Sequence, residues 1–396
     1  MRICFLTTSF PAHPDDIRSP FLLELCRALK KEHIDLDVIS PRYEGTTAED
    51  SMEGINVHRF SYFWPLNMQV LTQGGGIPSA LKTSWLARLQ FPLFFLAFLT
   101  RSLRYGKRCD IIHAQWSFSA LIGLFLKWTF KKPLVMTERG ASANLARNNW
   151  LMKKVLDFVV KRCDFVTANS LQQTELFVKL GVPKERTLTV LNGINTHRFK
   201  QRDKKTCRKK LNLPLNKKIV LFVGWLIERK NVESLIEAMS LVSKNIKNAL
   251  CIIVGEGNKK KSLENLAREM NLEKVVHFTN QVIPSQVALY MNAADVFVLP
   301  SLSEGKPNVV AEAMASGTPV VATNVAGTKE IVHDGKNGLL VMPKNQKDLA
   351  KAITAVLGNP ALAKKLSQQG LQTVHTSSLT WSYCAKQYIA IYNKIS

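Results

Sequence analysis

Residues 294–325 read ADVFVLPSLSEGKPNVVAEAMASGTPVVATNV and contain one complete unit of the expected fold. The apolar run VFVL is typical of a buried strand, and the polar loop LSEGKPN follows it. NVVAEAMA then continues as a helix, with Pro307 in the first turn and Gly317 at the end. PVVATNV repeats the strand pattern. Strand, helix and strand in this order are typical of a parallel sheet covered by helices.

The same alternation extends over the whole chain. In the first half, strands are expected within MRICFLTTSF, DLDVISP, DIIHAQW, PLVMTERG, DFVTANS and TLTVLNG. In the second half, they are expected within KIVLFVGW, ALCIIVGEG, KVVHFTN, ADVFVLPS, PVVATNV and GLLV. The helix SPFLLELCRALKK lies between two of these strands, and Ser19 suits its N-cap while Pro20 suits its first position. We therefore predict two doubly wound α/β domains whose ligands bind beyond the carboxyl ends of the strands.

A basic connector separates the two series. Residues 196–217 are dense in Lys and Arg and poor in apolar residues, which is typical of a solvated linker. The predicted domains are therefore residues 1–195 and 218–378. The last segment, residues 379–396, has an apolar helical face and is expected to pack back on the first domain. A length of 396 residues agrees with two domains.

The charge balance limits the partners. The net charge of +24 permits nucleic acid, an anionic membrane surface or phosphate-bearing small molecules as partners. The seven cysteines are scattered and form no paired motif, which favours reduced thiols in a cytosolic protein over disulfides or a zinc site. The N-terminus reads as a first strand and not as a signal peptide, and the longest apolar run, Phe91–Leu99, is too short to predict a transmembrane segment.

Two carboxylates flank the helix start in the first unit quoted above. Glu304 precedes it, Glu312 lies within the helix, and Gly305 leaves room for a ligand near the backbone. The free N–H groups of a helix start form an anion site, and carboxylates accept hydrogen bonds from vicinal hydroxyls. The pattern therefore suggests a nucleotide-sugar whose diphosphate lies between the two acids. From spacing alone, a solvated helix with incidental acids explains it about equally well.

The chain resembles the retaining glycosyltransferases of family 4, whose GT-B fold has two Rossmann-like domains facing a cleft. Their hallmark, E-x7-E, is present as Glu304 and Glu312. DIIHAQW, VLNGINTHRF, VGWLIERKN, VGEG and the tail LTWSYCAKQYIAIY follow in family order, so the likeness covers nearly the whole chain. It implies an enzyme of the bacterial polysaccharide or glycolipid type that needs no cofactor and no metal.

The resemblance also assigns residues. It gives the donor sugar's hydroxyls to Glu304, the ribose to Glu312, the diphosphate to the backbone amides of Asn308 and Val309, and the β-phosphate to Lys230. The further donor and nucleotide positions that we expect are Gly224, Trp225, Gly255, Glu256, Gly257, Val282, Ile283, Gly305, Lys306 and Pro307. The catalytic candidates are Glu304, Lys230, Arg229, Arg139 and His113.

Departures from the family pattern fall mostly in the first half. Arg139 stands where the family has a histidine, Ser142 where it has an aspartate, and Ser19 where it has a glycine. In the second half, Trp225 replaces a phosphate-binding arginine, for which Arg229 is a candidate substitute. Arg139 either clamps a phosphate or an anionic acceptor, or pairs with a nearby acid such as Glu138 or Asp164.

A histidine, a D-x-D motif and a basic apolar segment each have more than one interpretation. His113 follows an expected strand and is either a cleft residue or a core histidine. The D-x-D motif at Asp35–Asp37 lies at the wrong end of its strand for ligand binding, so we expect no metal site. Trp85–Arg108 has no acid and five basic residues, which favours a helix in a membrane interface over a core helix with a basic rim.

The sequence therefore predicts a retaining transferase that moves a sugar from a UDP- or GDP-sugar to a glycan or lipid-linked acceptor. We expect it in the cytoplasm, at the inner face of the cytoplasmic membrane, in polysaccharide, lipopolysaccharide or glycolipid synthesis. A GT-B sugar-nucleotide epimerase and a catalytically weak regulatory homologue are the alternatives. A nucleic-acid binder is disfavoured because no reading helix or aromatic platform is apparent.

Overall fold

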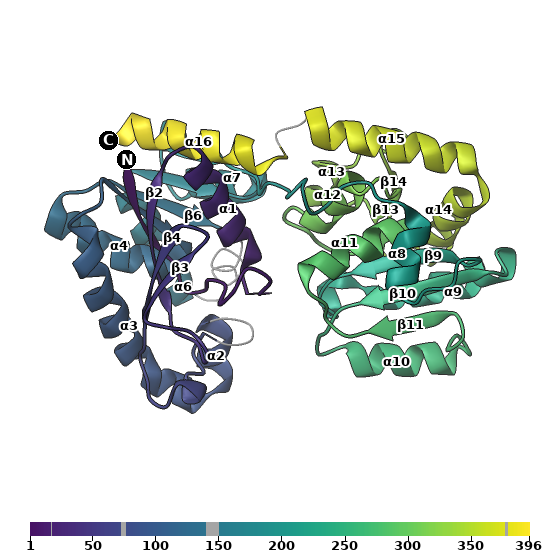
Figure 1. Ribbon diagram of the computed structural model, residues 1–396, viewed down its shortest axis with the longest axis horizontal. Helices are drawn as coiled ribbons and strands as arrows, with labels where there is room; N and C mark the ends of the chain where they lie inside the picture. Colours follow the sequence, from purple (N-terminus) through teal and green to yellow (C-terminus); the bar gives the residue numbers. More distant parts are fainter. Residues whose placement is uncertain (17, 73–76, 140–149, 377–378) are drawn as a thin grey trace. The chain divides into compact units, whose positions relative to one another are not determined.

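The computed structural model describes all residues except 17, 73–76, 140–149 and 377–378, and the chain divides into two compact units (Figure 1). Unit 1 contains Met1–Gly193 and Trp381–Ser396, and unit 2 contains Ile194–Thr380. Each unit holds one sheet covered by helices, which confirms the predicted α/β class.

Unit 1 has an eight-stranded sheet in the order β3-β4-β2-β1-β5-β6-β7-β8. All neighbouring strands are parallel except β3 and β4. The strands are β1 (Arg2–Leu6), β2 (Asp35–Pro41), β3 (Glu49–Met52), β4 (Ile55–Phe60), β5 (Ile111–Gln115), β6 (Leu134–Glu138), β7 (Phe165–Ala168) and β8 (Thr187–Thr189). The sequence did not predict the β3–β4 hairpin. The chain order reverses between β1 and β5, where a doubly wound sheet binds its ligands.

Helices cover both faces of this sheet. They are α1 (Pro20–Lys31), α2 (Ile77–Thr83), α3 (Trp85–Gly106), α4 (Trp116–Phe130), α6 (Trp150–Arg162), α7 (Leu171–Lys179) and α16 (Trp381–Ile395). Alternate residues of β1 face opposite layers: Ile3 and Phe5 belong to the core under α1 and α16, and Cys4 and Leu6 belong to the core under α3, α4 and α6. Since both faces are covered, the central strands read as unbroken apolar runs.

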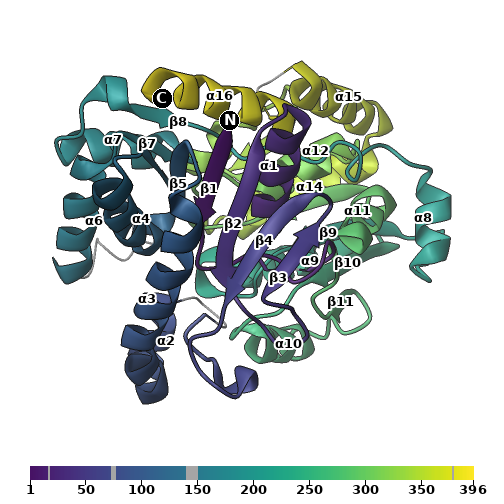
Figure 2. The same ribbon diagram turned by 60° about the vertical axis from the view of Figure 1, so that its left-hand side comes forward.

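The C-terminal helix α16 completes the first of these two layers. Its buried residues include Trp381, Cys384, Tyr388 and Tyr392, which join the same core cluster as α1. Figure 2 shows α1 and α16 side by side along the top of unit 1. The chain therefore leaves unit 1 for unit 2 and returns to it at its last helix.

Unit 2 has a six-stranded parallel sheet in the order β11-β10-β9-β12-β13-β14. The strands are β9 (Lys218–Val223), β10 (Ala249–Val254), β11 (Val276–Thr279), β12 (Val296–Leu299), β13 (Val320–Thr323) and β14 (Leu339–Val341). The helices are α8 (Lys204–Lys210), α9 (Val232–Asn245), α10 (Lys260–Glu269), α11 (Pro284–Ala293), α12 (Asn308–Ala315), α13 (Ala326–Lys329), α14 (Gln346–Gly358) and α15 (Pro360–Thr376). Here the order reverses between β9 and β12.

The basic connector needs a correction. Residues 196–217 were expected to be solvated throughout, but they contain α8, and the side chain of Arg208 on that helix is buried. Its guanidinium bonds Asp295 at 2.7 Å and three backbone carbonyls. Lys204 bonds the same carboxylate at 2.8 Å. The sequence analysis did not foresee the role of Asp295, the acid just before β12. Its carboxylate holds Lys204 and Arg208 of the basic segment against unit 2.

Helix α3 is long enough and apolar enough, by length and composition alone, to cross a membrane, and among the described residues it is the one helix of that kind. However, its inner face belongs to the unit 1 core, through Ala87, Phe94 and Phe98. All seven cysteines are buried free thiols.

Candidate functional site

The candidate donor site lies where the strand order of unit 2 reverses. The loop after β9 contains Gly224 to Lys230, and the loop after β12 contains Ser301 to Pro307. Since β9 and β12 are hydrogen-bonded neighbours, the carboxyl ends of these strands bring the two loops together. Leu302 N donates to Arg229 O at 2.9 Å, so the loops are also joined through their backbones.

The carboxylate of Glu304 lies at the centre of this junction. Its Oε1 accepts hydrogen bonds from Lys230 Nζ and Ser301 Oγ, both at 2.6 Å, and its Oε2 accepts one from Arg229 Nη1 at 3.1 Å. Glu304 and Lys230 are buried, with 7% and 8% of their surface exposed, whereas Arg229 is exposed. Burial lowers the pKa of Lys230, and the adjacent Glu304 carboxylate partly restores it. The structure thus brings together the three catalytic candidates of unit 2.

The charges of this cluster do not cancel. Two cations, the buried Lys230 and the exposed Arg229, meet one buried carboxylate, so the cluster carries one net positive charge. A diphosphate would supply the missing negative charge, and burial makes such an interaction stronger than it would be in water. The start of α12 adds to the attraction, because no described residue accepts from the amides of Asn308 and Val309 through a hydrogen bond. The sequence analysis placed Pro307 in the first turn of this helix, but the structure shows that Pro307 is its N-cap.

The second acid of the pair, Glu312, lies in α12 and is partly buried. Burial raises the pKa of Glu312 to about 7, and the positive charge of Arg198 opposes this shift. Glu312 is therefore ionised only in part near neutral pH. Its role as a ribose contact stays a prediction; in the ionised form, the carboxylate can accept hydrogen bonds from hydroxyl groups.

A small pocket opens beside the cluster. It has a volume of about 140 Å³ and lies beyond the ends of β9 and β10. Its lining residues are Val223, Gly224, Trp225, Val254, Gly255, Glu256, Gln281, Val282 and Val287. Five of the predicted nucleotide residues meet here. Gly257 and Ile283 do not belong to the lining, and Gln281 and Val287 were missed by the sequence analysis.

Two glycines allow the loops to approach each other. Gly255 has φ of 152°, and a Cβ there would lie 1.9 Å from the carbonyl oxygen of Gly224. Gly327, in α13, would place a Cβ 1.9 Å from the carbonyl oxygen of Gly305 and 2.6 Å from that of Glu304. Gly327 therefore sets the position of the Glu304 loop, and the sequence analysis overlooked it. The available signal was a glycine just after the strand pattern PVVATNV.

In unit 1, Arg139 follows β6 at the carboxyl edge of the sheet. Its guanidinium donates to Gln115 Oε1 at 3.0 Å and to Asn192 Oδ1, and it stacks over the ring of Phe21 at 4.8 Å. Among the described residues, no carboxylate lies within ion-pair distance of it. Asp164, one of the partners considered from the sequence, bonds Lys127 instead. Glu138, the other partner considered, accepts a hydrogen bond from the backbone N–H of Arg139 at 3.1 Å, so the guanidinium itself is held by neutral groups. Ser142 lies outside the described residues.

The catalytic prediction for His113 is corrected by the structure. His113 lies within β5 and not after it, and its side chain is fully buried. Its ring nitrogens bond Tyr392 and Thr137, both at 2.7 Å. Burial, together with the charge of Arg139, lowers the pKa of His113 to about 3. In the alternation of β5, His113 faces the same way as Ile111, towards the core beneath α16. His113 is therefore a neutral core residue.

The first loop of unit 1, residues 7–19, contains the serine that replaces the family glycine. Ser19 has φ of 46° and ψ of 48°, in the left-handed region that glycine adopts most readily. Ser19 is the N-cap of α1, as predicted, but its side chain makes no capping hydrogen bond. Its hydroxyl donates to Ser9 Oγ at 3.0 Å instead. Ser19 thus has a backbone conformation that a glycine would adopt at a lower energetic cost.

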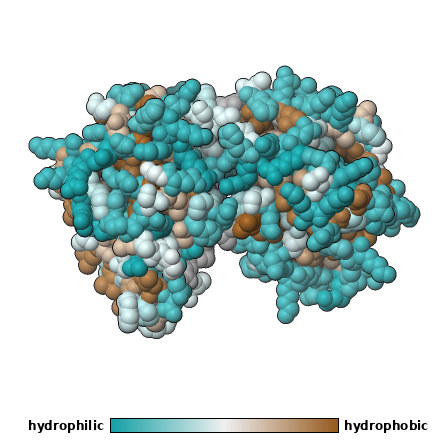
Figure 3. All heavy atoms as spheres, in the orientation of Figure 1, coloured by the Kyte–Doolittle hydropathy of each residue, from teal (hydrophilic) through white to brown (hydrophobic). Residues whose placement is uncertain are grey.

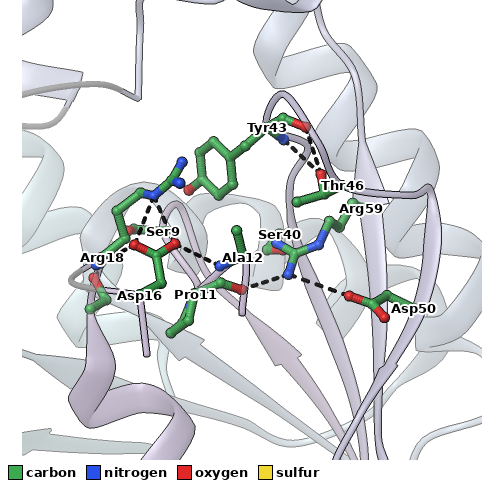
Figure 4. Close-up of polar contacts among 11 residues, drawn as sticks. Ser9, Pro11, Ala12, Asp16, Arg18, Ser40, Tyr43, Thr46, Asp50 and Arg59 are labelled. Carbon is green, nitrogen blue, oxygen red and sulfur yellow. Dashed lines mark hydrogen bonds and ion pairs between the residues drawn. The ribbon is translucent and has the colours of Figure 1, made fainter. Parts of the chain in front are cut away.

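Charged side chains hold this loop in place (Figure 4). Asp16 accepts hydrogen bonds from Arg18, whose guanidinium lies 4.2 Å from the centre of the Tyr43 ring. Arg59, only 1% exposed, donates to the carbonyl oxygen of Pro11 at 2.6 Å, and burial lowers the pKa of Arg59. Pro11, Ala12, Asp16 and Arg18 of this loop are therefore tied to one another or to Tyr43 and Arg59 by these contacts.

Comparison with known proteins agrees with this geometry. Residues 20–198 match the model of Glycosyltransferase Family 4, and residues 203–373 match that of Glycosyl transferases group 1. A D-inositol 3-phosphate glycosyltransferase of Corynebacterium aurimucosum is 29% identical over 301 residues, which cover 72% of this chain and 71% of the relative.

Solved structures match over nearly the full length. Sucrose-phosphate synthase from Thermosynechococcus elongatus superposes with a TM-score of 0.81 at 25% identity, over 99% of this chain and 98% of that one. HepE of Anabaena, solved in complex with UDP and glucose, has a TM-score of 0.76 at 20% identity over the whole of both chains, and shows the same fold. The protein therefore belongs to the group 1, family 4 glycosyltransferases, GT-B enzymes of the retaining hexosyltransferase type that use a nucleotide-sugar donor.

Proposed function

We propose that this protein transfers a hexose from a UDP- or GDP-sugar, with retention of configuration, to a glycan or lipid-linked acceptor of the cell surface. The observation that carries the donor part is the cluster of Glu304, Lys230 and Arg229 beside the start of α12. It combines an excess of positive charge with a carboxylate that can bind hydroxyl groups. HepE was solved with UDP, so uridine nucleotides are the first donors to test.

Donor binding changes the partners within this cluster. The diphosphate takes hydrogen bonds from Lys230, Arg229 and the first amides of α12, and the oxygens of Glu304 then accept hydrogen bonds from the sugar hydroxyls. The same cations stabilise the diphosphate as it departs, where the negative charge of the transition state develops. Among the described residues of this site, no second carboxylate adjoins the cluster as a nucleophile, so front-side attack by the acceptor within the ion pair fits the residues best.

The enzyme is also proposed to work at the inner face of the cytoplasmic membrane, in polysaccharide, lipopolysaccharide or glycolipid synthesis. The net charge of +24 supports this location, because the cytoplasmic leaflet carries anionic lipids. A lipid-linked acceptor would then diffuse in the plane of the membrane to an enzyme already held there.

A catalytically weak homologue is a second candidate, favoured by one observation. Trp225, which replaces a phosphate-binding arginine, is 56% exposed at the rim of the pocket, and its substitute Arg229 is already bonded to Glu304 and to Ser303 O. Turnover without this arginine must then rest on Lys230 and the helix amides.

A panel of UDP-glucose, UDP-galactose, UDP-N-acetylglucosamine and GDP-mannose tests the proposal. Release of the nucleoside diphosphate and donor affinity are measured for the wild type, for Glu304→Ala and for a matched control, Glu273→Ala, at an exposed glutamate of the same unit. We expect release with at least one donor, lost in Glu304→Ala and kept in the control. Binding without release would support the weak homologue, and a new sugar-nucleotide formed without release would indicate an epimerase.

A further inference from the structure

The outer surface of α3 and α4 is unusually apolar for an exposed part of a protein. We call it the aromatic–leucine face. It consists of Trp85, Leu89, Leu93 and Leu96 on α3 and of Phe125 and Trp128 on α4, which are 74%, 58%, 45%, 57%, 42% and 54% exposed. In Figure 3, hydrophobic residues gather at the lower left, over α3. Isolated exposed apolar residues are common, but a contiguous group of this size indicates a partner.

The residues of this face form one continuous surface. On α3 they recur every three or four positions, so they lie along one side of the helix. Phe95 of α3 contacts Phe125 of α4, with ring centroids 5.9 Å apart, and Phe125 in turn contacts Trp128 at 6.1 Å. The row therefore continues from one helix to the next.

The charged residues of the segment that carries this face are almost all basic, although two acids from other elements pair with it, Glu49 with Arg101 and Asp164 with Lys127. The segment from Trp85 to Lys132 contains eight Lys and Arg residues and a single acid, Asp110. That acid accepts a hydrogen bond from the backbone of Arg2 at 2.7 Å. Arg88, Arg104, Lys107, Arg108 and Lys131 are exposed along the two helices. A purely protein partner would need a surface both apolar and acidic, whereas an anionic bilayer offers both properties at once.

The buried side of α3 restricts how the helix can contact a bilayer. Ala87, Phe94 and Phe98 are packed in the unit 1 core, so lipid cannot surround the helix. The apolar row from Trp85 to Leu96 also extends only about 18 Å, well short of the roughly 30 Å of a hydrocarbon core. Tryptophan favours the boundary between lipid and water.

We propose that unit 1 docks on an anionic lipid bilayer through the aromatic–leucine face, with α3 lying in the plane of the interface and not across the membrane. The apolar side chains enter the boundary between head groups and acyl chains, and the basic residues bind lipid phosphates. This deepens the proposed location, but it does not depend on sugar transfer, so either proposal can fail alone.

The test is co-flotation of the full-length protein with vesicles of phosphatidylcholine containing phosphatidylglycerol. We expect binding that weakens about tenfold in Leu89→Gln/Leu96→Gln, because two half-exposed leucines lose their transfer into lipid. The matched control is Leu171→Gln/Leu215→Gln, at leucines that are 56% and 50% exposed outside this face. It should bind as the wild type does. All four substituted positions are exposed, and circular dichroism with thermal unfolding reports whether the variants are folded.

A second pair of variants tests the charge. Arg104→Gln/Arg108→Gln should weaken vesicle binding about tenfold or more, while Lys205→Gln/Lys209→Gln on α8 should leave it unchanged. Glu304→Ala should bind vesicles normally, which separates docking from catalysis. The proposal is wrong if the wild type does not float with anionic vesicles, if the control variants lose binding equally, or if the face instead supports a dimer, seen by sedimentation, that Leu89→Gln/Leu96→Gln dissociates.

Discussion

The carboxyl edges of the two sheets differ in how their charges are arranged. At the edge of unit 2, Lys230 and Arg229 converge on the buried carboxylate of Glu304. At the edge of unit 1, the guanidinium of Arg139 is held by the amide side chains of Gln115 and Asn192 and forms no ion pair with a carboxylate of the described residues. Both edges lie at the reversal point of a doubly wound sheet.

The two edges therefore differ in whether their cations are already paired. The cations of unit 2 form ion pairs with Glu304, whereas the guanidinium of Arg139 in unit 1 forms none with a described residue. In unit 2, the proposed donor would replace an existing ion pair, so its recognition would depend on an exchange of partners. In unit 1, the guanidinium of Arg139 is oriented by neutral groups, and no carboxylate of the described residues neutralises its charge. The first arrangement suits a donor of one defined chemistry. The second suits an acceptor that brings a negative or strongly polar group.

Removing the lysine of the unit 2 cluster should have the largest effect. Lys230→Met leaves Glu304 buried without its closest cation, and breaking a buried pair in this way typically costs about 3 kcal/mol of unfolding free energy. Diphosphate release should also fall by about 100-fold or more, because a group that stabilises the departing charge is lost. Chemical denaturation and a product assay measure the two effects.

The double variant Lys230→Met/Glu304→Gln sharpens this result. It removes both charges, so it should regain much of the lost stability while activity stays low. Stability that does not recover in the double variant would show that the pair is not the source of the loss.

A smaller effect is expected at Glu312, and it depends on pH. Its pKa is raised to about 7 from an ordinary value of 4.5, so the folded protein binds more protons than the unfolded chain between these values. The stability linked to this group is present below pH 4.5 and is lost as pH rises through 7. Glu312→Gln should therefore stabilise the protein at pH 8, by about 1 to 3 kcal/mol, and have little effect at pH 5. Thermal unfolding at both pH values measures this, and an equal change at both would contradict a buried, titrating Glu312.

The unit 1 edge should respond differently from the unit 2 edge. Arg139→Met is expected to leave donor affinity unchanged and to reduce transfer to endogenous acceptors, supplied as a membrane extract, about tenfold, which is the value of one charged hydrogen bond. Calorimetry with UDP and a radiolabelled transfer assay separate the two effects. A matched loss of UDP affinity would place Arg139 in the donor site and remove the contrast between the two edges.

Much of the fold was predictable because the signals were local. The strand and helix patterns of unit 2 lie within a few residues of their observed bounds, and the E-x7-E spacing located Glu304 and Glu312 through the resemblance to a known family. Three features were not predictable in this way. The side chain of His113 is in the core because it packs on and bonds to Tyr392, Arg208 is buried because of the distant Asp295, and Gly327 matters because a Cβ there would overlap Gly305. Each depends on a contact between residues far apart in the chain.

The smallest expected effect concerns Ser19, which replaces the family glycine in the first loop of unit 1. Ser19→Gly and Ser19→Ala both remove the hydroxyl that donates to Ser9 Oγ, so they lose the same hydrogen bond. They differ in the free energy that position 19 needs to adopt its left-handed conformation at φ of 46°. This conformation costs a residue with a Cβ about 1 kcal/mol, whereas it costs glycine little. Ser19→Gly should therefore be more stable than Ser19→Ala by about 1 kcal/mol in chemical denaturation. Equal stability of the two variants would mean that the first loop relaxes out of this conformation, and that the support from Asp16, Arg18 and Arg59 does not fix it.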